Sequence, residues 1–309
     1  MRRFRNVLLM AGLEYGQVPR YLFDRALSLA RRNRAKLTLI DVVPDNDLAS
    51  EFLPPEMAEF DLRYRRESLA RLAGMAQEKD VDIETGLAVG RPFLEITRQV
   101  QSFKHDLVVT DGGRGPDARG WIDSTTMHLM RDCPCAIWVA RPCPGDRYKR
   151  VLAAIDPYPT DPEKDSLNRK ILELAVSVAE LEGGQLHVVH AWRLLRASVG
   201  EAPEAWKGWE RTARIELKRR LGEFVAAHSL GSNPQVHLVV GRPSLAITQI
   251  AHEKQIDLLV MGTVCRTGIR GFFMGNTAEG VLRRVACSLL TFKPYGFVSP
   301  IYSSMFSGG

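Results

Sequence analysis

Short apolar runs alternate with longer segments of helical period along the chain. In the second half, runs of four to six apolar residues predict strands near 150–156, 186–191, 235–240, 257–262 and 288–293. Runs that stay apolar at successive positions suit strands that are buried on both faces, as in a parallel sheet. The pattern therefore predicts an α/β fold with a mostly parallel sheet and with helices on both of its faces.

The clearest helical stripe follows the second of these strands. Its positions recur every three or four residues and are Trp206, Trp209, Ala213, Leu217, Leu221, Phe224 and His228. The first half has a matching segment, whose one side carries Met57, Phe60, Tyr64, Leu72 and Met75. Such stripes are typical of core packing, so we expect both helices to bury these side chains.

The two halves are copies of one domain. Val89-Gly90-Arg91-Pro92 returns as Val240-Gly241-Arg242-Pro243, and the run 105–109 returns as 256–260, both 151 residues later. A repeat of this length predicts a tandem duplication. We expect a first domain at residues 1–146, a second at 147–294, and a tail at 295–309 outside the repeat.

Composition and charge limit the partners. The chain has 309 residues, 45% of them hydrophobic, and a net charge of +6 that is spread over both halves. The arginine clusters lie on polar helix faces and accompany no recognised nucleic-acid-binding module, so we predict no nucleic-acid partner. No apolar run reaches the roughly 20 residues that span a bilayer, so we predict no membrane partner.

The beginning of the chain imitates a secretory signal. Basic residues 2–5 precede the apolar run 7–11, but Glu14 interrupts that run, and the same pattern recurs at residues 150–155. A first β-strand is therefore the better interpretation. The five cysteines are an odd number at scattered positions, which predicts free thiols, a reducing compartment and a cytoplasmic location.

Candidate chemistry gathers after the strands of the second half. In open parallel sheets, ligands bind beyond the carboxyl ends of the strands, where the strand order reverses. Asp156 follows the first strand, His190-Ala191 ends the second, and Gly262-Thr263 opens the segment after the fourth. That segment leads to Gly275-Asn276-Thr277-Ala278-Glu279, in which Asn276 and Glu279 have the form of an N-cap and its capping-box partner. Together with Gly275, the amides of the helix start predict an anion cradle.

The run GTVCRTGIRGFFMGNTAE at 262–279 resembles the ATP-binding motif of the universal stress protein family. The residues identical to that motif are Gly262, Arg266, Thr267, Gly268, Gly275, Ala278 and Glu279. The resemblance spans about residues 4–294 and is greatest to tandem-domain members of the E type in the UspA superfamily. Cys265 departs from the motif, because it stands where the family has its second glycine.

This resemblance implies two tandem domains, each an open five-stranded parallel sheet of the adenine nucleotide α-hydrolase-like kind. It also implies pairing of the domains about a pseudo-twofold axis through the last strands, at 137–139 and 290–292. The implied function is that of a cytoplasmic stress-response regulatory protein that acts on an unidentified protein partner. As in the family's homodimers, the internal pair would make one assembly, and a further homodimer stays open.

The resemblance also implies a site for ATP, in the second domain only. Asp156 would meet the adenine or ribose, and Ala191 would contact the base through its backbone. Gly262, Gly275 and Asn276 would line the phosphates. The remaining site residues in this segment are Thr263, Cys265, Arg266 and Thr277.

The first domain departs further from the motif. Its first strand runs into Ala11-Gly12 without a carboxylate, and Asp123-Ser124-Thr125 stands where the helix should begin. A carboxylate would thus face any phosphate. We predict no nucleotide there and a structural or partner-binding role.

Other interpretations stay open. An adenylating or ATP-hydrolysing enzyme would usually carry a Ser-Gly-Gly-x-Asp-Ser loop or an HxGH-type signature, and neither occurs; we expect at most a slow ATPase and no catalytic residues. The first domain, floored by residues 10–12, could instead hold an apolar or lipid-like ligand. For Cys133, Cys135 and His128 the choice is between a metal site and buried thiols, and the spacing favours thiols. His187 and His190 are expected to be packed or hydrogen-bonded.

Overall fold

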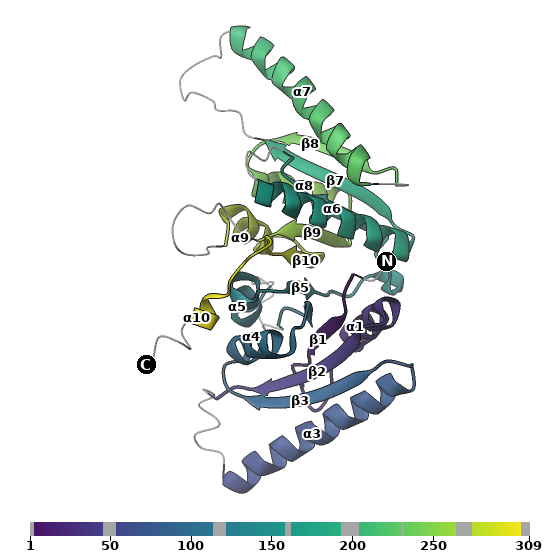
Figure 1. The fold of residues 1–309 in the computed structure, drawn as a ribbon, viewed down its shortest axis with the longest axis vertical. Coiled ribbons are helices and arrows are strands. Elements are labelled where there is room, and N and C mark those ends of the chain that lie inside the picture. Colours follow the sequence, from purple (N-terminus) through teal and green to yellow (C-terminus); the bar gives the residue numbers. More distant parts are fainter. Residues whose placement is uncertain are drawn as a thin grey trace. The chain divides into compact units, whose positions relative to one another are not determined.

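The structure is a computed structural model that describes residues 3–45, 54–113, 122–157, 162–192, 204–229, 232–263 and 274–303. The chain divides into two compact units (Figure 1). Of the described residues, the first unit contains those within 3–146 and 297–303, and the second contains those within 147–263 and 274–296.

The first unit is a five-stranded parallel sheet with the strand order β3-β2-β1-β4-β5. Its strands are β1 (Asn6–Met10), β2 (Lys36–Val43), β3 (Ile83–Val89), β4 (Leu107–Thr110) and β5 (Ala136–Val139). Its helices are α1 (Arg20–Asn33), α3 (Pro55–Gln77), α4 (Pro92–Phe103), α5 (Ser124–Asp132) and the short 3-10 turn η1 (Pro144–Asp146). The strand order reverses between β1 and β4, which is where a parallel sheet offers a ligand cleft.

The second unit repeats this topology with the strand order β8-β7-β6-β9-β10, again all parallel. Its strands are β6 (Arg150–Ala154), β7 (Gln185–Trp192), β8 (Gln235–Val240), β9 (Leu258–Gly262) and β10 (Ser288–Phe292). Its helices are α6 (Pro162–Glu182), α7 (Glu204–His228), α8 (Pro243–Glu253) and α9 (Asn276–Leu282). Here the order reverses between β6 and β9. The short helix α10 (Pro300–Ser303) comes last in the chain and is grouped with the first unit.

The central strands form the core of each unit. Val7, Leu8 and Leu9 of β1 are fully buried, as are Val151 and Leu152 of β6. Complete burial of successive residues means that both faces of the strand are covered, because neighbouring side chains point to opposite faces. This is why these strands appear in the sequence as continuous apolar runs.

The repeated Gly-Arg-Pro motif starts α4 in the first unit and α8 in the second. Gly90 and Gly241 have φ angles of 148° and 146°, a region that glycine alone adopts readily. Their N–H groups donate to the carbonyls of Val43 and Trp192, both at 2.9 Å. Proline then takes the first position of α4 and of α8, where its missing N–H is no loss.

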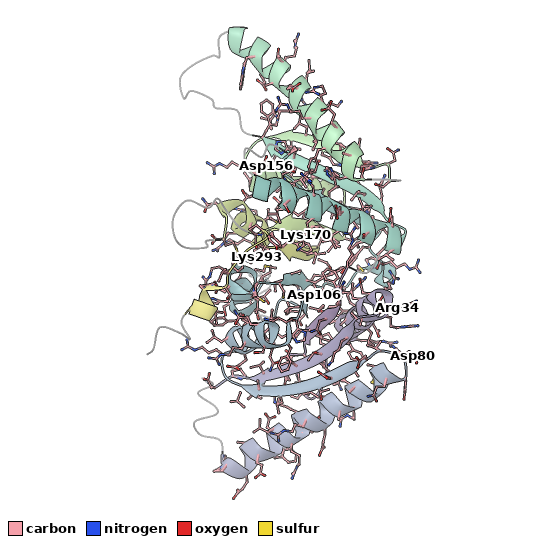
Figure 2. The ribbon with its side chains drawn as sticks, in the orientation of Figure 1. Arg34, Asp80, Asp106, Asp156, Lys170 and Lys293 are labelled. Carbon is pink, nitrogen blue, oxygen red and sulfur yellow. The ribbon has the colours of Figure 1, made fainter. Side chains whose placement is uncertain are left out.

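The repeated aspartate before the fourth strand ties down the first strand. Asp106 (Figure 2) accepts hydrogen bonds from the N–H groups of Arg5 at 2.7 Å and Asn6 at 3.2 Å. Asp257 accepts from the N–H of Arg150 at 2.8 Å in the same way. The aspartate therefore has the same structural role in both units, which is to hold the start of the first strand.

The apolar stripes of α3 and α7 are buried only in part. Within the described residues, the buried positions of α3 are Ser68, Leu69 and Ala76, all in its second half. Met57 and Phe60 are each 57% exposed, and Tyr64 and Met75 are exposed as well. In α7, Leu221 is buried, but Trp209 is exposed. The expectation of core packing along whole stripes is wrong, because the N-terminal turns of both helices diverge from the sheet (Figure 1).

The predicted fold class is confirmed by these two parallel sheets, and the predicted first strand is present as β1. How the units pair stays a prediction. Within the ranges described, no helix is long and apolar enough to cross a membrane.

Candidate functional site

Asp156 stands just beyond β6, at the reversal point of the second sheet. Its N–H donates to Asn168 Oδ1 at 3.0 Å, and Asn168 Nδ2 donates to its carbonyl. This amide of α6 holds the Asp156 backbone on both sides, whereas 62% of the Asp156 side chain is exposed (Figure 2). The carboxylate is therefore fixed in place by its backbone and remains open to a ligand.

The end of β7 approaches Asp156 from the neighbouring strand. The buried His190 ring places Nδ1 3.1 Å from the Ile155 carbonyl and 3.9 Å from Asp156 Oδ1. Burial lowers the pKa of His190 below its ordinary value, so the ring is neutral near pH 7 and donates to the carbonyl. Ala191 follows and is half-buried. The structure thus brings together Asp156 and the His190-Ala191 pair, as the sequence analysis expected.

On the other side of β6, the end of β9 is joined to the start of α9. Thr263 is buried; its N–H donates to the Phe292 carbonyl at 3.1 Å, and its hydroxyl reaches the same oxygen at 3.4 Å. The N–H of Gly275 donates to the Thr263 carbonyl at 3.1 Å. Gly262 has a packing reason to lack a side chain, because a Cβ there would lie 2.8 Å from Leu167 Cδ2.

The predicted cap of α9 is wrong in its register. Gly275 is the N-cap residue, with an extended backbone, and no side chain caps the helix. Asn276 is the first helical residue and is exposed, and Thr277 follows it. Glu279 turns away from the helix start, because its carboxylate pairs with Arg283 Nη2 at 2.6 Å. The chain closes back onto Thr263 one residue earlier than a capping box requires, and among the described residues no side chain caps the first turn.

Two of the predicted site residues, Cys265 and Arg266, lie outside the described residues. The same holds for the whole run 264–273. The described part of the site therefore consists of the strand ends after β6, β7 and β9 and the first turn of α9.

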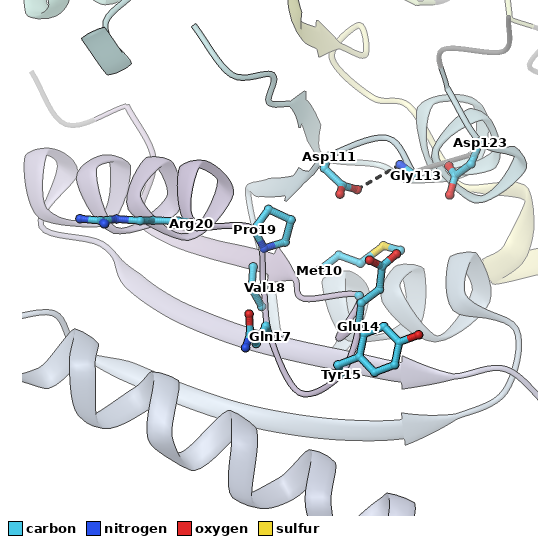
Figure 3. Close-up of a pocket in the computed structure, with 11 residues that line it drawn as sticks. Met10, Glu14, Tyr15, Gln17, Val18, Pro19, Arg20, Asp111, Gly113 and Asp123 are labelled. Atoms are coloured by element: carbon cyan, nitrogen blue, oxygen red, sulfur yellow. Dashed lines mark hydrogen bonds between the residues drawn. The ribbon is translucent and has the colours of Figure 1, made fainter. Parts of the chain in front are cut away.

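The equivalent edge of the first unit is hollowed by a cavity of about 560 Å³ (Figure 3). It is lined by Met10, Gly12, Glu14, Tyr15, Gln17, Val18, Pro19, Arg20, Asp111, Gly113 and Asp123. The carboxylates of Glu14, Asp111 and Asp123 gather around it, whereas the Arg20 guanidinium points away and pairs with Asp24. The cavity is thus acidic.

Asp123 occupies the start of α5 in this unit. It is the N-cap residue, and its Oδ1 accepts from the N–H of Thr126 at 2.7 Å. Asp111 accepts from the N–H of Gly113 at 3.0 Å in the facing loop. The sequence predicts a carboxylate at this helix start, and Asp123 provides it. The amides that would meet a phosphate already have a negative partner within the chain.

A buried ion pair, which the sequence analysis did not find, builds the loop under this cavity. Asp41 on β2 is fully buried and accepts from the N–H of Leu13 at 3.0 Å and from Arg65 Nη1 at 2.7 Å. Burial opposes the charge on Arg65, but its hydrogen bonds to Asp61 and Asp41 raise its pKa above the ordinary value. A charged residue inside the apolar run of β2 was the available signal, because a buried carboxylate needs a partner.

His187 of β7 forms a pair with His237 of β8. His187 Nδ1 lies 3.1 Å from His237 Nε2, the ring planes differ by 7°, and the centroids are 5.4 Å apart. The nitrogens therefore meet edge to edge, with one ring donating and the other accepting. Burial, followed by His237, Lys254 and Arg150, lowers the pKa of His187 to about 4, and burial lowers that of His237. The expectation of hydrogen-bonded histidines is confirmed for His187 and His190.

The cysteines of the first unit are thiols in close contact. Cys133 is buried, and its Sγ lies 3.6 Å from that of Cys135. Burial and the neighbouring Cys133 raise the pKa of Cys135 well above its ordinary value, which makes this thiol unreactive. Cys143 and Cys287 are also thiols that form no disulfide with a described cysteine, and Cys143 Sγ accepts from Arg25 Nη2 at 3.6 Å. Among the residues that the structure describes, no group of three or more His, Cys, Asp or Glu side chains could hold a metal ion.

The family model of the universal stress protein family matches residues 9–141 and again residues 147–293. The chain belongs to the universal stress protein family. Both matched segments coincide with the two parallel sheets, so the duplication seen in the sequence is a duplication of this family's domain.

Relatives of known sequence share the tandem arrangement. Universal stress protein E of Escherichia coli (strain K12) is 30% identical over 222 residues, which cover 68% of each chain. Universal stress protein E of Photorhabdus laumondii is 25% identical over an aligned length of 324 positions, and the alignment covers 97% of this chain and 98% of that one. This chain is therefore similar over its length to E-type universal stress proteins, as its motif predicted.

Solved structures agree on the fold. A crystal structure of a functionally unknown protein from Pseudomonas aeruginosa PAO1 is 22% identical, covers 95% of this chain and 94% of that chain, and has a TM-score of 0.74. At that identity the likeness concerns the fold alone. Other universal stress proteins have been solved in complex with cAMP and, from Archaeoglobus fulgidus, with dAMP; each covers about half of this chain, and these ligands are those proteins' own.

Proposed function

We propose that this protein is a stress-response regulatory protein whose second unit binds an adenine nucleotide, ATP in the first instance, and whose first unit does not. The observation that carries the proposal is the Asp156 carboxylate, exposed at the reversal point of the sheet while Asn168 holds its backbone. Ligands of open α/β sheets bind beyond the carboxyl ends of the strands at this reversal point, and a carboxylate there can accept hydrogen bonds from ribose hydroxyls. Asp156 is accordingly the ribose or adenine contact.

The remaining site residues follow from the motif and its position. The backbone of Ala191 meets the base, and Gly262, Gly275 and Asn276 line the phosphates. The N–H of Gly275 is not a phosphate donor in this arrangement, because it already donates to the Thr263 carbonyl. Thr263 contributes by holding the segment in position, because its N–H and hydroxyl reach the Phe292 carbonyl and its own carbonyl accepts from Gly275. Cys265, Arg266 and Thr277 complete the segment. The first turn of α9 supports this arrangement, since no side chain of the described residues caps it.

Calorimetry with ATP on the full chain tests the proposal, with ADP, AMP, cAMP and dAMP as further probes. Wild-type protein is expected to bind ATP, and Asp156→Ala is expected to lose at least about tenfold in affinity, the size of one charge-assisted hydrogen bond. Asp82→Ala is the matched control, because Asp82 is an exposed aspartate of the first unit. Absence of binding at millimolar nucleotide contradicts the proposal. Equal binding by Asp156→Ala contradicts the assignment of the site alone.

In this proposal the bound nucleotide acts by changing the surface offered to a protein partner in the cytoplasm, and turnover is slow or absent. No nucleophile with a partnered base is seen near Asp156 among the described residues, and His190 donates to a backbone carbonyl instead. Pyrophosphate release in a substrate screen would favour an adenylating enzyme instead. A lipid co-purified with the protein, detected by native mass spectrometry, would favour a lipid-binding first unit, although three carboxylates line the cavity there.

A further inference from the structure

The N-terminal turns of α3 present an apolar face that their own unit leaves uncovered. We define the α3 face as Met57, Phe60 and Tyr64, three exposed side chains at helical spacings of three and four residues. The Tyr64 ring lies 6.4 Å from that of Phe60, nearly parallel to it, and the Tyr64 hydroxyl donates to the Tyr15 carbonyl. Phe60 and Tyr64 thus contact neighbouring groups and are still open to solvent. A cluster of exposed apolar side chains indicates an interaction surface, whereas single exposed apolar side chains do not.

A stripe of charges runs beside the α3 face. Glu56, Glu59, Arg63 and Arg66 recur at spacings of three, four and three residues, so they lie along one flank of the helix. All four are exposed, and none of them has an ion pair with another described residue. The Arg63 guanidinium instead lies over the Phe60 ring, 5.6 Å from its centroid. By contrast, Glu216 of α7 pairs with both Arg219 and Arg220 on its own helix.

The order of these charges is self-complementary. Along the stripe two negative charges precede two positive ones, and the sign changes near residue 61. When two copies of the helix lie antiparallel about a twofold axis at that position, Glu56 meets Arg66 of the other copy. Glu59 then meets Arg63, and Met57 comes opposite Tyr64. A parallel arrangement would put the two charged stripes on opposite sides of the contact, so they would not meet.

We propose that the α3 face binds the α3 face of a second copy of this chain in an antiparallel, twofold-symmetric contact. Isologous contacts of this kind require a surface that complements itself, and both the apolar and the charged stripe meet that requirement. The occupant is therefore another copy of the protein. The inference is independent of nucleotide binding, since it involves no residue of the proposed site.

Sedimentation analysis of the full chain over a wide range of concentrations is the first test. Wild-type protein is expected to show reversible dimerisation, and Phe60→Ser to weaken it at least about tenfold, as removal of a central aromatic contact does. Phe103→Ser is the matched control, because Phe103 of α4 is 58% exposed and Phe60 is 57% exposed. It is expected to leave the dimer unchanged.

Charge reversal provides a sharper test. Glu59→Arg and Arg63→Glu, each alone, would place like charges together and are expected to be monomeric. An equimolar mixture of the two variants is expected to dimerise again, because each mixed contact restores both opposite pairs. Loss of a helix or of folding could not be repaired by mixing, so recovery is specific to the proposed geometry.

Several outcomes would overturn the proposal. The first is a wild-type chain that stays monomeric at every concentration. The α3 face would then serve another occupant, either residues 46–53 of the same chain or a different protein. The second is a dimer that survives Phe60→Ser and both charge reversals, since it would then use another surface. The third is a mixture of the single variants that stays monomeric.

Discussion

The two units share one fold and differ at the edge where a ligand would enter. In the first unit Asp123 caps α5 with its carboxylate, whereas the equivalent N-cap of α9 in the second unit is Gly275. Beneath that edge, Asp41 holds the loop after β1 through an ion pair with Arg65, and His190 holds the loop after β6 as a neutral donor. The first copy thus has a carboxylate at the helix start, where the second has Gly275 and, at the end of β6, the exposed carboxylate of Asp156. The duplicated scaffold is the same in both copies, whereas the charge at this edge differs.

The largest effect is expected from breaking the ion pair of the first unit. Arg65→Met leaves the Asp41 carboxylate buried without a cation, which costs about 3 kcal/mol of unfolding free energy. Urea denaturation followed by circular dichroism measures this. Asp41→Asn combined with Arg65→Met should recover part of the loss. His190→Ala, the counterpart in the second unit, is expected to cost only about 1 kcal/mol. Equal losses of unfolding free energy in Arg65→Met and His190→Ala would contradict the proposed difference between the Asp41–Arg65 ion pair and the neutral His190.

The histidine pair makes the second unit sensitive to acid. His187 resists protonation in the folded state down to a pKa of about 4, whereas its ordinary value is 6.5. The unfolded chain therefore takes up the proton first as pH falls from about 6.5 towards 4, and unfolding free energy decreases by up to about 1.4 kcal/mol per pH unit for each proton.

The corresponding position of the first unit is Thr38, so His187→Thr should flatten this dependence. Hydrogen exchange measured at a series of pH values, resolved along the chain, should show the loss of protection in β7 and β8 before β2 and β3. Simultaneous loss in both sheets, or an unchanged pH profile in His187→Thr, would contradict this cause.

Transfer of the carboxylate from one unit to the other tests the difference in ligand binding. Gly275→Asp gives α9 the cap that α5 has, and its charge should weaken ATP binding at least about tenfold, which equals about 1.4 kcal/mol. Gly275→Asn, which can cap the helix without a charge, should bind more tightly than the aspartate variant. Calorimetry compares the two. Equal affinities would show that charge at this N-cap does not govern binding.

The smallest effect concerns the cap of α5 itself. Asp123→Ala removes the acceptor for the N–H of Thr126 and is expected to lower unfolding free energy by about 1 kcal/mol. Asp123→Asn should retain most of the stability, because the amide oxygen can still accept. Thermal denaturation of both variants provides the measurement. A stable alanine variant would mean that Asp123 is not needed as a cap.

Much of the fold could be predicted because a strand that is buried on both faces has apolar residues at successive positions. The fully buried β1 and β6 appear as apolar runs, and the repeated motifs at Gly90, Gly241, Asp106 and Asp257 turn out to be structural. The strand ends then placed Asp156 and His190 together correctly. Asp156 and His190 could be expected to lie close together because they follow or end neighbouring parallel strands, β6 and β7.

Other features were beyond prediction from the pattern alone. Helical period shows that Met57 and Phe60 share a face, but it cannot show whether anything covers that face. The aspartate in the apolar run of β2 predicts that a buried carboxylate needs a partner. It does not identify Arg65 as that partner, because Arg65 lies on α3. The register of α9 depended on where the chain folds back onto Thr263, a contact with no sequence signature.

The strand order has a consequence for synthesis. β1 lies at the centre of its sheet, yet the Asp106 that fixes its first amides is 101 residues away from Arg5. At about 5–20 residues per second, a ribosome delivers β4 roughly 5–20 seconds after β1. During that interval one edge of the earliest strand has no neighbour, and the same delay recurs when β6 waits for β9. Each copy of the domain therefore passes through one such interval while it is being made. Codon choice or a chaperone that changes the length of this interval would alter the yield of folded protein without changing a residue.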